Sequence, residues 1–350
     1  MKVLVIQKKR IGDVLTSTII FEALKEKFPE SELHYLIYEN AVDVVKNNPF
    51  IDKIVLLDNK ARKSKFEFVK FLFSIRKEKY DVVIDAYGKP NSVIIGWFSG
   101  AKKTITFYKN YAKLLYTDTI YRTEKSFSSA TRAIEHRMQL LEPLEIRFKE
   151  IAPKIIITNE ELEAAKADLI RSNINPSKPI IMISAVGSNA LKTYKTDYLA
   201  EVLNEICNHK EVQILFNYLP FQKVIALEIY NNCNENSKKS IFIDYYKENL
   251  REFLAITKLC DALIGNEGGA TNMAKALSVP TFTLFSPTVP KEDWNMFEND
   301  TTNISVHIND YEIIKKITFN EEETSQSYLK FKPHLFKDKL IKFINYNIRS

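Results

Sequence analysis

The feature that most constrains the fold is a strand, a glycine turn, a helix and a second strand within residues 261–285. Residues 261–264 form an apolar run that is long enough for a buried strand but too short for a helix. A turn with two adjacent glycines, Gly268 and Gly269, follows it. Residues 270–277 are typical of a helix and residues 281–285 of a second strand. The segment therefore predicts one βαβ unit with its glycines at the carboxyl end of the first strand.

Glycines at such a turn let the backbone approach a ligand closely, and the helix start offers unpaired N–H groups at the positive end of its dipole. Anionic groups bind in this setting, beyond the carboxyl ends of the strands. We therefore expect an anion site near Gly268. The alternative is a tight turn in which the glycines only relieve strain.

Strands and helices alternate through both halves of the chain. Further strands are predicted at residues 2–6, 33–38, 54–57, 82–85, 179–184, 212–216 and 241–244. Because several of these runs are apolar on both faces and helices separate them, they predict an α/β fold with parallel sheets. We expect two Rossmann-like, doubly wound domains that face each other across a cleft, over residues 1–172 and 178–320. Residues 321–350 are predicted as a tail and helix, with packing on the N-terminal domain as one arrangement.

Composition excludes several classes of protein. With 350 residues, 45% hydrophobic and 27% charged, the chain resembles a soluble globular protein of two domains. A net charge of +6 and a pI near 8.9, without a dense basic repeat, favour acidic small molecules or an anionic membrane face over nucleic acid. The chain opens into a strand, and no apolar run reaches the ~18 residues of a spanning helix. We expect a cytoplasmic protein.

The sequence lacks residue spacings that are typical of metal ligands. It also lacks the motifs of several enzyme classes. The three cysteines lack CxxC spacing and the five histidines show no ligand spacing, so we predict no metal site and no cofactor. No GxSxG, P-loop or GxGxxG motif is present, which leaves hydrolase, kinase and dinucleotide hypotheses without their motifs.

Two segments, residues 60–79 and 102–125, are rich in basic and aromatic residues. The first predicts an amphipathic helix with cationic flanks, which is typical of an element that faces an acceptor or a membrane surface. An ordinary crossover helix with a solvated face is the favoured alternative. Peripheral contact with a membrane surface therefore stays open.

Three segments in chain order resemble glycosyltransferase family 9, the heptosyltransferases of bacterial envelope biosynthesis. They are VLVIQKKRIGDVLTSTIIFEALKEKFPESELHYL at residues 3–36, SAVGSNALKTYKTDYLAEVL at residues 184–203, and LCDALIGNEGGATNMAKALSVPTFTLFSPTVPKEDW at residues 259–294. The resemblance implies a GT-B fold, with acceptor bound mainly by the first domain and nucleotide sugar by the second. It also implies inverting transfer without a metal ion, of heptose from ADP-heptose onto a lipopolysaccharide core or related envelope glycan. For a bacterial envelope enzyme of this kind, the surface of any peripheral contact would be the inner membrane.

Some residues depart from the family pattern. Glu267-Gly268-Gly269 stands where the family usually has Asp-Thr-Gly, and Asn272 stands where it usually has His. Residues 217–222, ending in Gln222, replace a Gly-Gly-Pro-like loop and an acidic residue that approach the nucleoside. A different nucleotide-sugar donor therefore remains an alternative, as does a non-catalytic nucleotide- or sugar-binding member of the fold.

Asp13 is the candidate general base, because sugar transfer needs a group that takes the proton of the acceptor hydroxyl. Its carboxylate directly follows Gly12 in the loop after the first strand, and the family's Gly-Asp carries the base there. The alternative is that Asp13 only caps the next helix. Lys8 and Arg10 in the same loop, with Gly12, are predicted to bind an anionic, lipid-linked glycan acceptor; a solvated basic loop is the alternative.

Lys192 is the candidate for neutralising the departing diphosphate, with Lys195 a weaker alternate. The remaining predicted donor-binding residues follow strands of the second domain and are Ser188, Asn189, Gln222, Glu267, Gly268, Gly269, Ala270, Thr271 and Asn272. Backbone N–H groups near Gly269 and the Thr271 hydroxyl are expected at the diphosphate. Glu267 would repel phosphates, so we assign it to ribose or sugar hydroxyls or to helix capping. Asn272 either donates to a phosphate or sugar oxygen or is packed in the helix.

Overall fold

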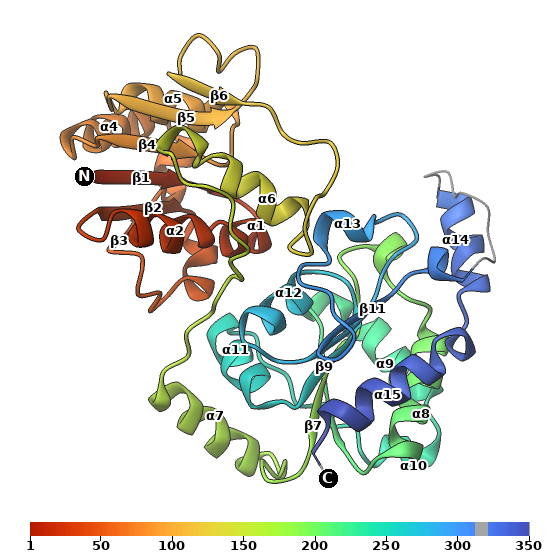
Figure 1. Cartoon of the computed structure of the whole chain (residues 1–350). Helices are drawn as coiled ribbons and strands as arrows, with labels where there is room; N and C mark the ends of the chain where they lie inside the picture. Colours follow the sequence, from red (N-terminus) through yellow and green to blue (C-terminus); the bar gives the residue numbers. More distant parts are fainter. Residues whose placement is uncertain (312–320, 350) are drawn as a thin grey trace. The chain divides into compact units, whose positions relative to one another are not determined.

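The computed structural model describes residues 1–311 and 321–349, and it divides into two compact units, Met1–Ile156 and Ile157–Ser350 (Figure 1). Each unit contains a parallel sheet with helices around it. The α/β prediction is therefore confirmed in both halves of the chain.

The sheet of unit 1 has the strand order β3-β2-β1-β4-β5-β6. Its strands are β1 (Lys2–Ile6), β2 (Glu32–Ile37), β3 (Lys53–Leu56), β4 (Val82–Asp85), β5 (Lys103–Phe107) and β6 (Asp118–Ile120). Its helices are α1 (Ile11–Thr16), α2 (Ile19–Lys27), α3 (Asn59–Lys63), α4 (Lys65–Lys77), α5 (Pro90–Phe98) and α6 (Arg132–Gln139), with 3-10 turns η1 (Glu39–Val44) and η2 (Glu142–Leu144). Because β1 pairs with both β2 and β4, the direction of winding reverses between β1 and β4. Ligands of doubly wound sheets bind beyond the carboxyl ends of such strands.

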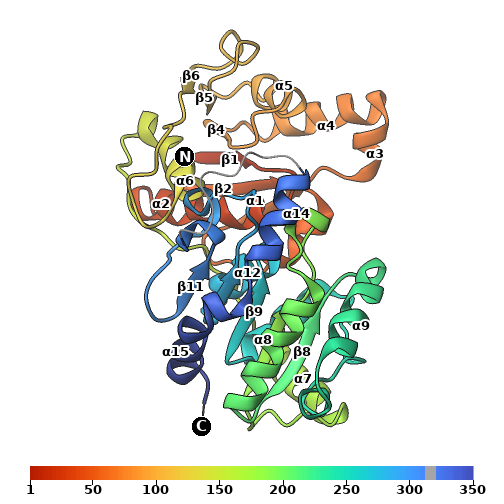
Figure 2. The same ribbon diagram turned by 90° about the vertical axis from the view of Figure 1, so that its right-hand side faces the viewer.

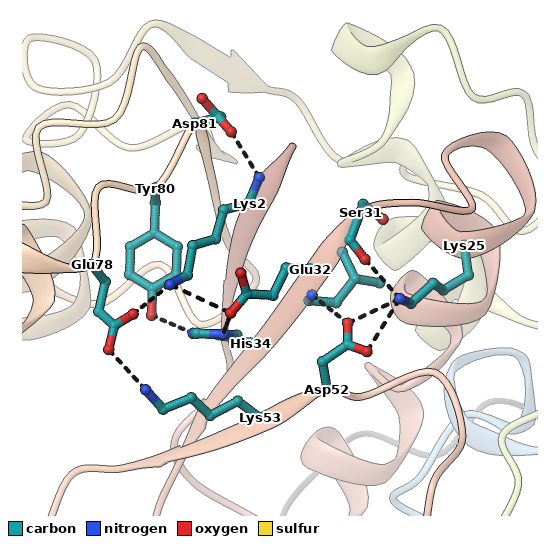
Figure 3. Close-up of polar contacts among 11 residues, drawn as sticks. Lys2, Lys25, Ser31, Glu32, His34, Asp52, Lys53, Glu78, Tyr80 and Asp81 are labelled. Atoms are coloured by element: carbon teal, nitrogen blue, oxygen red, sulfur yellow. Dashed lines mark hydrogen bonds and ion pairs between the residues drawn. The ribbon is translucent and has the colours of Figure 1, made fainter.

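A network of charged groups ties together the amino-terminal edge of this sheet (Figure 3). Lys53 donates to Glu78 at 2.8 Å, and Lys2 pairs with the same carboxylate. The buried His34 ring contacts the Tyr80 hydroxyl at 2.8 Å and Glu32 at 2.7 Å. Because these groups lie at the edge opposite the loops that follow β1 and β4, we interpret them as determinants of stability.

The sheet of unit 2 has the strand order β11-β10-β9-β7-β8. Its strands are β7 (Ile180–Ser184), β8 (Gln213–Asn217), β9 (Ala262–Asn266), β10 (Thr281–Leu284) and β11 (Asn303–Val306). Its helices are α7 (Asn159–Arg171), α8 (Thr196–His209), α9 (Lys223–Asn232), α10 (Glu235–Lys238), α11 (Leu250–Leu259), α12 (Gly269–Ala276), α13 (Lys291–Trp294), α14 (Glu321–Lys330) and α15 (Lys337–Asn347). Its 3-10 turns are η3 (Ala190–Lys192), η4 (Pro220–Gln222), η5 (Ile308–Asp310) and η6 (Pro333–Leu335). Winding reverses between β7 and β9, which places the βαβ unit of residues 261–285 at that point.

One strand prediction is wrong. Residues 241–244 do not form a strand; Ile241 makes a single bridge to Ile214 at the edge beyond β8. The residues after Ile241 form a turn, so the pairing does not continue.

The chain divides between the units at residue 156, before the predicted limit at residue 172. α7 contacts α11, and Arg251 donates to both carboxylate oxygens of Glu161 at 2.6 and 2.7 Å, which joins α7 to unit 2. The C-terminal helix α15 also packs within unit 2, where Phe343 contacts the ring of Phe282. The predicted limit of the second domain at residue 320 lies outside the described residues.

Candidate active site

Lys192 and Glu267 come together at the winding reversal of unit 2. Lys192 lies in the loop after β7 and Glu267 directly follows β9. The Lys192 Nζ atom is 2.9 Å from Glu267 Oε1. The lysine side chain is 34% exposed, whereas the glutamate is 8% exposed. Two of the predicted donor-binding residues, distant in sequence, thus form one ion pair at the edge where ligands of this fold bind.

The start of α12 supplies the second part of this site. Gly268 is its N-cap residue, with φ of 152°, a conformation that L side chains rarely adopt. A Cβ atom built on Gly268 would meet nothing within 4 Å, so the backbone here borders open space. The first N–H groups of a helix have no partner within it and carry partial positive charge. This geometry leaves room for an anion at the start of α12, and the anion site itself stays a prediction.

Other predicted residues of α12 differ in their surroundings. Thr271 is buried, and its hydroxyl donates to the Asn266 carbonyl at 3.1 Å, so that proton already has an acceptor. Ala270 is buried on the same helix. Asn272 is partly exposed, so its contact with a phosphate or sugar oxygen stays a prediction. Gly269 is exposed at the helix start.

The loop that carries Lys192 is held by its own backbone. A Cβ atom on Gly187 would lie 2.0 Å from the Lys192 carbonyl oxygen, so only glycine permits this close approach. The Asn189 side chain accepts a hydrogen bond from the Lys192 N–H at 3.1 Å, and Ser188 is exposed. Asn189 therefore caps the turn that carries the lysine.

Gln222 supports the same loop. It is buried, and its amide donates to the Gly187 carbonyl at 2.9 Å. Its carbonyl oxygen accepts from the Leu219 N–H at 2.8 Å. Both ends of the side chain are thus engaged by the protein, and contact of Gln222 with a donor stays a prediction.

Asn266, at the end of β9, joins the two loops. It is fully buried, and its amide donates to the carbonyls of Ser184 and Ala185, both at 2.9 Å. Its carbonyl oxygen accepts from the Tyr194 N–H at 2.6 Å. The residue that precedes Glu267 therefore fixes the backbone that leads to and from Lys192.

The C-terminal segment forms hydrogen bonds with the loop that carries Lys192. The Tyr328 hydroxyl on α14 donates to the Leu191 carbonyl at 3.2 Å, and Ser286 donates to the same oxygen at 2.6 Å. In the opposite direction, Tyr194 donates to the Phe331 carbonyl and Tyr198 to the Leu329 carbonyl. The hydrogen bonds of Tyr328 and Ser286 hold residue 191, next to Lys192, in place, whereas those of Tyr194 and Tyr198 hold residues 331 and 329.

In unit 1, Asp13 lies in the first turn of α1 and pairs with Arg137 of α6. Arg137 Nη2 is 2.7 Å from Asp13 Oδ1, and its Nε donates to the Ser17 hydroxyl at 3.2 Å. The N-cap residue of α1 is Arg10, so the hypothesis that Asp13 is the N-cap is wrong. The Asp13 side chain remains 21% exposed. It is therefore a positioned carboxylate that a substrate can still reach.

Lys8 matches neither of the two expectations for its loop, which were acceptor binding and exposure to solvent. Its side chain is 1% exposed, so it is neither a solvated lysine nor one presented to an acceptor at the surface. Its Nζ lies 5.5 Å from the centre of the Tyr87 ring. Burial lowers the pKa of Lys8 to about 8, with Asp85 acting in the opposite direction. By contrast, Arg10 is exposed and Gly12 partly exposed, as acceptor contact requires.

Comparison with known proteins identifies the family. The family model described as glycosyltransferase family 9 (heptosyltransferase) matches residues 68–323. The chain belongs to glycosyltransferase family 9. It is an enzyme of the heptosyltransferase-like class of glycosyltransferases, as predicted.

Individual relatives are similar to this family 9 enzyme over most of its length. The lipopolysaccharide heptosyltransferase 1 of Campylobacter coli is 24% identical over 297 residues, covering 82% of this chain and 84% of that protein. A family 9 glycosyltransferase structure from Veillonella parvula has a TM-score of 0.81 at 17% identity and covers 98% of this chain and 96% of that one. The ADP-heptose lipopolysaccharide heptosyltransferase II of Escherichia coli has a TM-score of 0.72 at 14% identity, covering 97% and 98%. The two units thus have the GT-B fold that the resemblance implied.

Sequence reasoning missed the residues that hold the family 9 site in place. Arg137 was not selected, because nothing local in the sequence connects it to Asp13. Asn266 and Tyr328 were not selected either, because their contacts join segments far apart in the chain.

Within residues 1–311 and 321–349, no group of three or more His, Cys, Asp and Glu side chains is arranged to hold a metal ion. In the same described ranges, no helix is both long enough and apolar enough to cross a membrane.

Proposed function

We propose that this family 9 enzyme transfers heptose from ADP-heptose onto a lipopolysaccharide core or a related envelope glycan, with inversion and without a metal ion. The relatives from C. coli and E. coli support this choice, since both are lipopolysaccharide heptosyltransferases and the second is named for ADP-heptose. The observation that carries the proposal is the Lys192–Glu267 pair beside the start of α12.

The donor half of the reaction is assigned to unit 2. The diphosphate is proposed to bind the N–H groups at the start of α12 and the Lys192 ammonium, because both are positive, Gly268 borders open space and the lysine side chain is 34% exposed. Glu267, which cannot face a phosphate without repulsion, is then available to accept hydrogen bonds from sugar hydroxyls. As the bond between the anomeric carbon and the diphosphate oxygen breaks, these positive groups stabilise the charge that develops on the leaving group.

The acceptor half is assigned to Asp13. Its carboxylate takes the proton of the acceptor hydroxyl while that oxygen forms a bond to the anomeric carbon. A single displacement opposite the leaving diphosphate inverts the anomeric centre. Arg137 fixes the carboxylate in one orientation through the 2.7 Å ion pair. Arg10 is proposed to contact anionic groups of the acceptor.

Transfer from a panel of ADP-, UDP-, GDP- and CMP-linked sugars to a lipopolysaccharide core acceptor tests the proposal. We expect nucleotide release only with ADP-heptose, a product of inverted configuration by NMR, and loss of transfer in Lys192→Ala. Lys239 is exposed and directly follows α10, away from the residues of the proposed site in the chain. Lys239→Ala is therefore the matched control, and we expect it to keep wild-type transfer. Transfer from another nucleotide sugar would show that the donor is not ADP-heptose. Binding of a nucleotide sugar without transfer would identify a non-catalytic member of the fold.

A further inference from the structure

Helix α4 has two apolar faces, of which only one is covered by protein. Leu72 and Ile75 are buried against the sheet of unit 1, at 7% and 2% exposure. Phe66, Val69 and Phe73, spaced three and four residues apart, form a second face and are 67%, 46% and 54% exposed. An ordinary crossover helix carries polar residues on its outer face. The outer face of α4 is instead an apolar ridge.

The ridge continues onto the neighbouring helix α5, which contacts α4 (Figures 1 and 2). The rings of Phe73 and Phe98 pack edge to face with their centres 5.2 Å apart. Trp97 is 54% exposed beside them, and Ile94, one turn earlier, is also exposed. We call Phe66, Val69, Phe73, Ile94, Trp97 and Phe98 the aromatic face. Contiguous exposed apolar side chains of this kind mark an interaction surface.

Cations border the aromatic face. At about 100° per residue, Lys65 and Arg76 fall on one side of the ridge of α4, and Lys70 and Lys77 fall on the other. The Lys70 ammonium lies over the Phe66 ring at 4.3 Å. Across residues 58–79 there are eight Lys and Arg against three Asp and Glu. An apolar ridge between two cationic rows is the pattern of a helix that lies in a membrane interface.

We propose that the aromatic face docks on an anionic lipid bilayer. The aromatic and aliphatic side chains would enter the boundary between headgroups and acyl chains, where Trp is favoured, while the flanking ammonium and guanidinium groups meet lipid phosphates. A second copy of this chain is a poorer occupant, because a two-fold contact through the same face would place like-charged rows against each other. This docking is independent of the identity of donor and acceptor.

Flotation of the full-length protein with lipid vesicles tests this surface. We expect the protein to bind vesicles of phosphatidylcholine with ~30% phosphatidylglycerol, to bind pure phosphatidylcholine at least ten-fold more weakly, and to lose most binding in 0.5 M NaCl. The double variant Phe66→Gln with Val69→Gln should lower the partition coefficient about ten-fold. The triple variant Lys65→Gln with Lys70→Gln and Lys77→Gln should also lower it about ten-fold on anionic vesicles. All five side chains are exposed or partly exposed, so folding should be kept and circular dichroism checks it.

A matched control lies in unit 2, where Phe221 and Val224 have the same spacing and are 79% and 77% exposed. Phe221→Gln with Val224→Gln should bind vesicles as the wild type does. Equal loss in this control, equal binding to neutral vesicles, or absence of binding would overturn the proposal. So would self-association that the Phe66 and Val69 changes abolish, which would identify a dimer interface. Because the readout needs neither donor nor acceptor, its failure leaves the proposed transfer untouched.

Discussion

The ammonium group of Lys192 lies 2.9 Å from a carboxylate oxygen of Glu267, and this pair stands where a nucleotide diphosphate is proposed to bind. A lysine that is already paired must exchange its partner, or share it, when a phosphate arrives. Under this proposal the carboxylate has two opposite effects: it opposes the diphosphate and offers hydrogen-bond acceptors to the sugar. The two effects can be separated by comparing ADP with an ADP-sugar.

Glu267→Gln should bind ADP several-fold more tightly than the wild type, because the substitution removes a negative charge beside the diphosphate. The same change should lower transfer about ten-fold or more, because a carboxylate makes stronger hydrogen bonds to sugar hydroxyls than an amide. Isothermal titration calorimetry and initial rates measure the two effects. Lys192→Ala should weaken ADP binding, and equal weakening in Glu267→Gln would contradict the assignment of the carboxylate to the sugar.

Arg137→Ala should lower kcat about ten- to a hundred-fold while leaving the dissociation constant for ADP unchanged. The reason is that Arg137 orients Asp13 and both residues belong to unit 1, whereas ADP is proposed to bind unit 2. Asp13→Asn should lower kcat further, since it removes the proton acceptor itself. Arg132→Ala, on the same helix, is the matched control and should keep wild-type kcat. A weakened ADP affinity in Arg137→Ala would show that the substitution disturbs more than Asp13.

Tyr328→Phe should weaken ADP binding by a few-fold, because it removes one of two hydrogen bonds that hold the Leu191 carbonyl next to Lys192. Its cost in the free energy of unfolding should be about 1 kcal/mol. Tyr198→Phe loses a comparable hydrogen bond, to the Leu329 carbonyl, and serves as the control. Calorimetric titration with ADP distinguishes them; if both variants bind alike, Tyr328 has no special role in placing the loop.

Glu78 should make the stability of the protein depend on pH in the acid range. Hydrogen bonds from Lys2 and then Lys53 lower the pKa of Glu78 to about 2, from an ordinary value of 4.5. Because the folded pKa is depressed, the stabilisation is present above pH 4.5 and is lost as the pH falls toward 2. Denaturant unfolding should therefore show Glu78→Gln to be less stable than the wild type by about 1 kcal/mol at pH 6, with the difference shrinking at pH 3. A constant difference across this range would contradict the ion-pair explanation.

Removal of divalent cations should leave transfer unchanged if Lys192 and the start of α12 carry the charge neutralisation. Rates measured after dialysis against EDTA, with and without added Mg²⁺ or Mn²⁺, provide the test. Transfer that stops with EDTA and returns with one of these ions would mean that a metal ion shares the diphosphate.

Local sequence patterns predict much of the fold and the candidate donor loops. The apolar runs of β1, β4, β7 and β9 alternate with amphipathic helices, and this alternation alone predicts parallel sheets. Glycine at position 268 indicates a special backbone conformation, which the φ of 152° bears out. The strand predicted at residues 241–244 does not form, because only Ile241 pairs with the neighbouring strand. An edge strand requires continued pairing with its neighbour, and an apolar run in the sequence does not show whether that pairing continues.

The sequence by itself determined the α/β alternation, the loops that carry Gly12 and Gly268, and the choice of Asp13 and Lys192 as candidates. Each of these rests on residues close together in the chain. Only the tertiary structure decided how these residues are held. It paired Asp13 with Arg137 across 124 positions, engaged Gln222 with Gly187, and buried Lys8 against Tyr87. Such contacts depend on which strands become neighbours in the sheet. Periodicity within one segment carries no information about that choice.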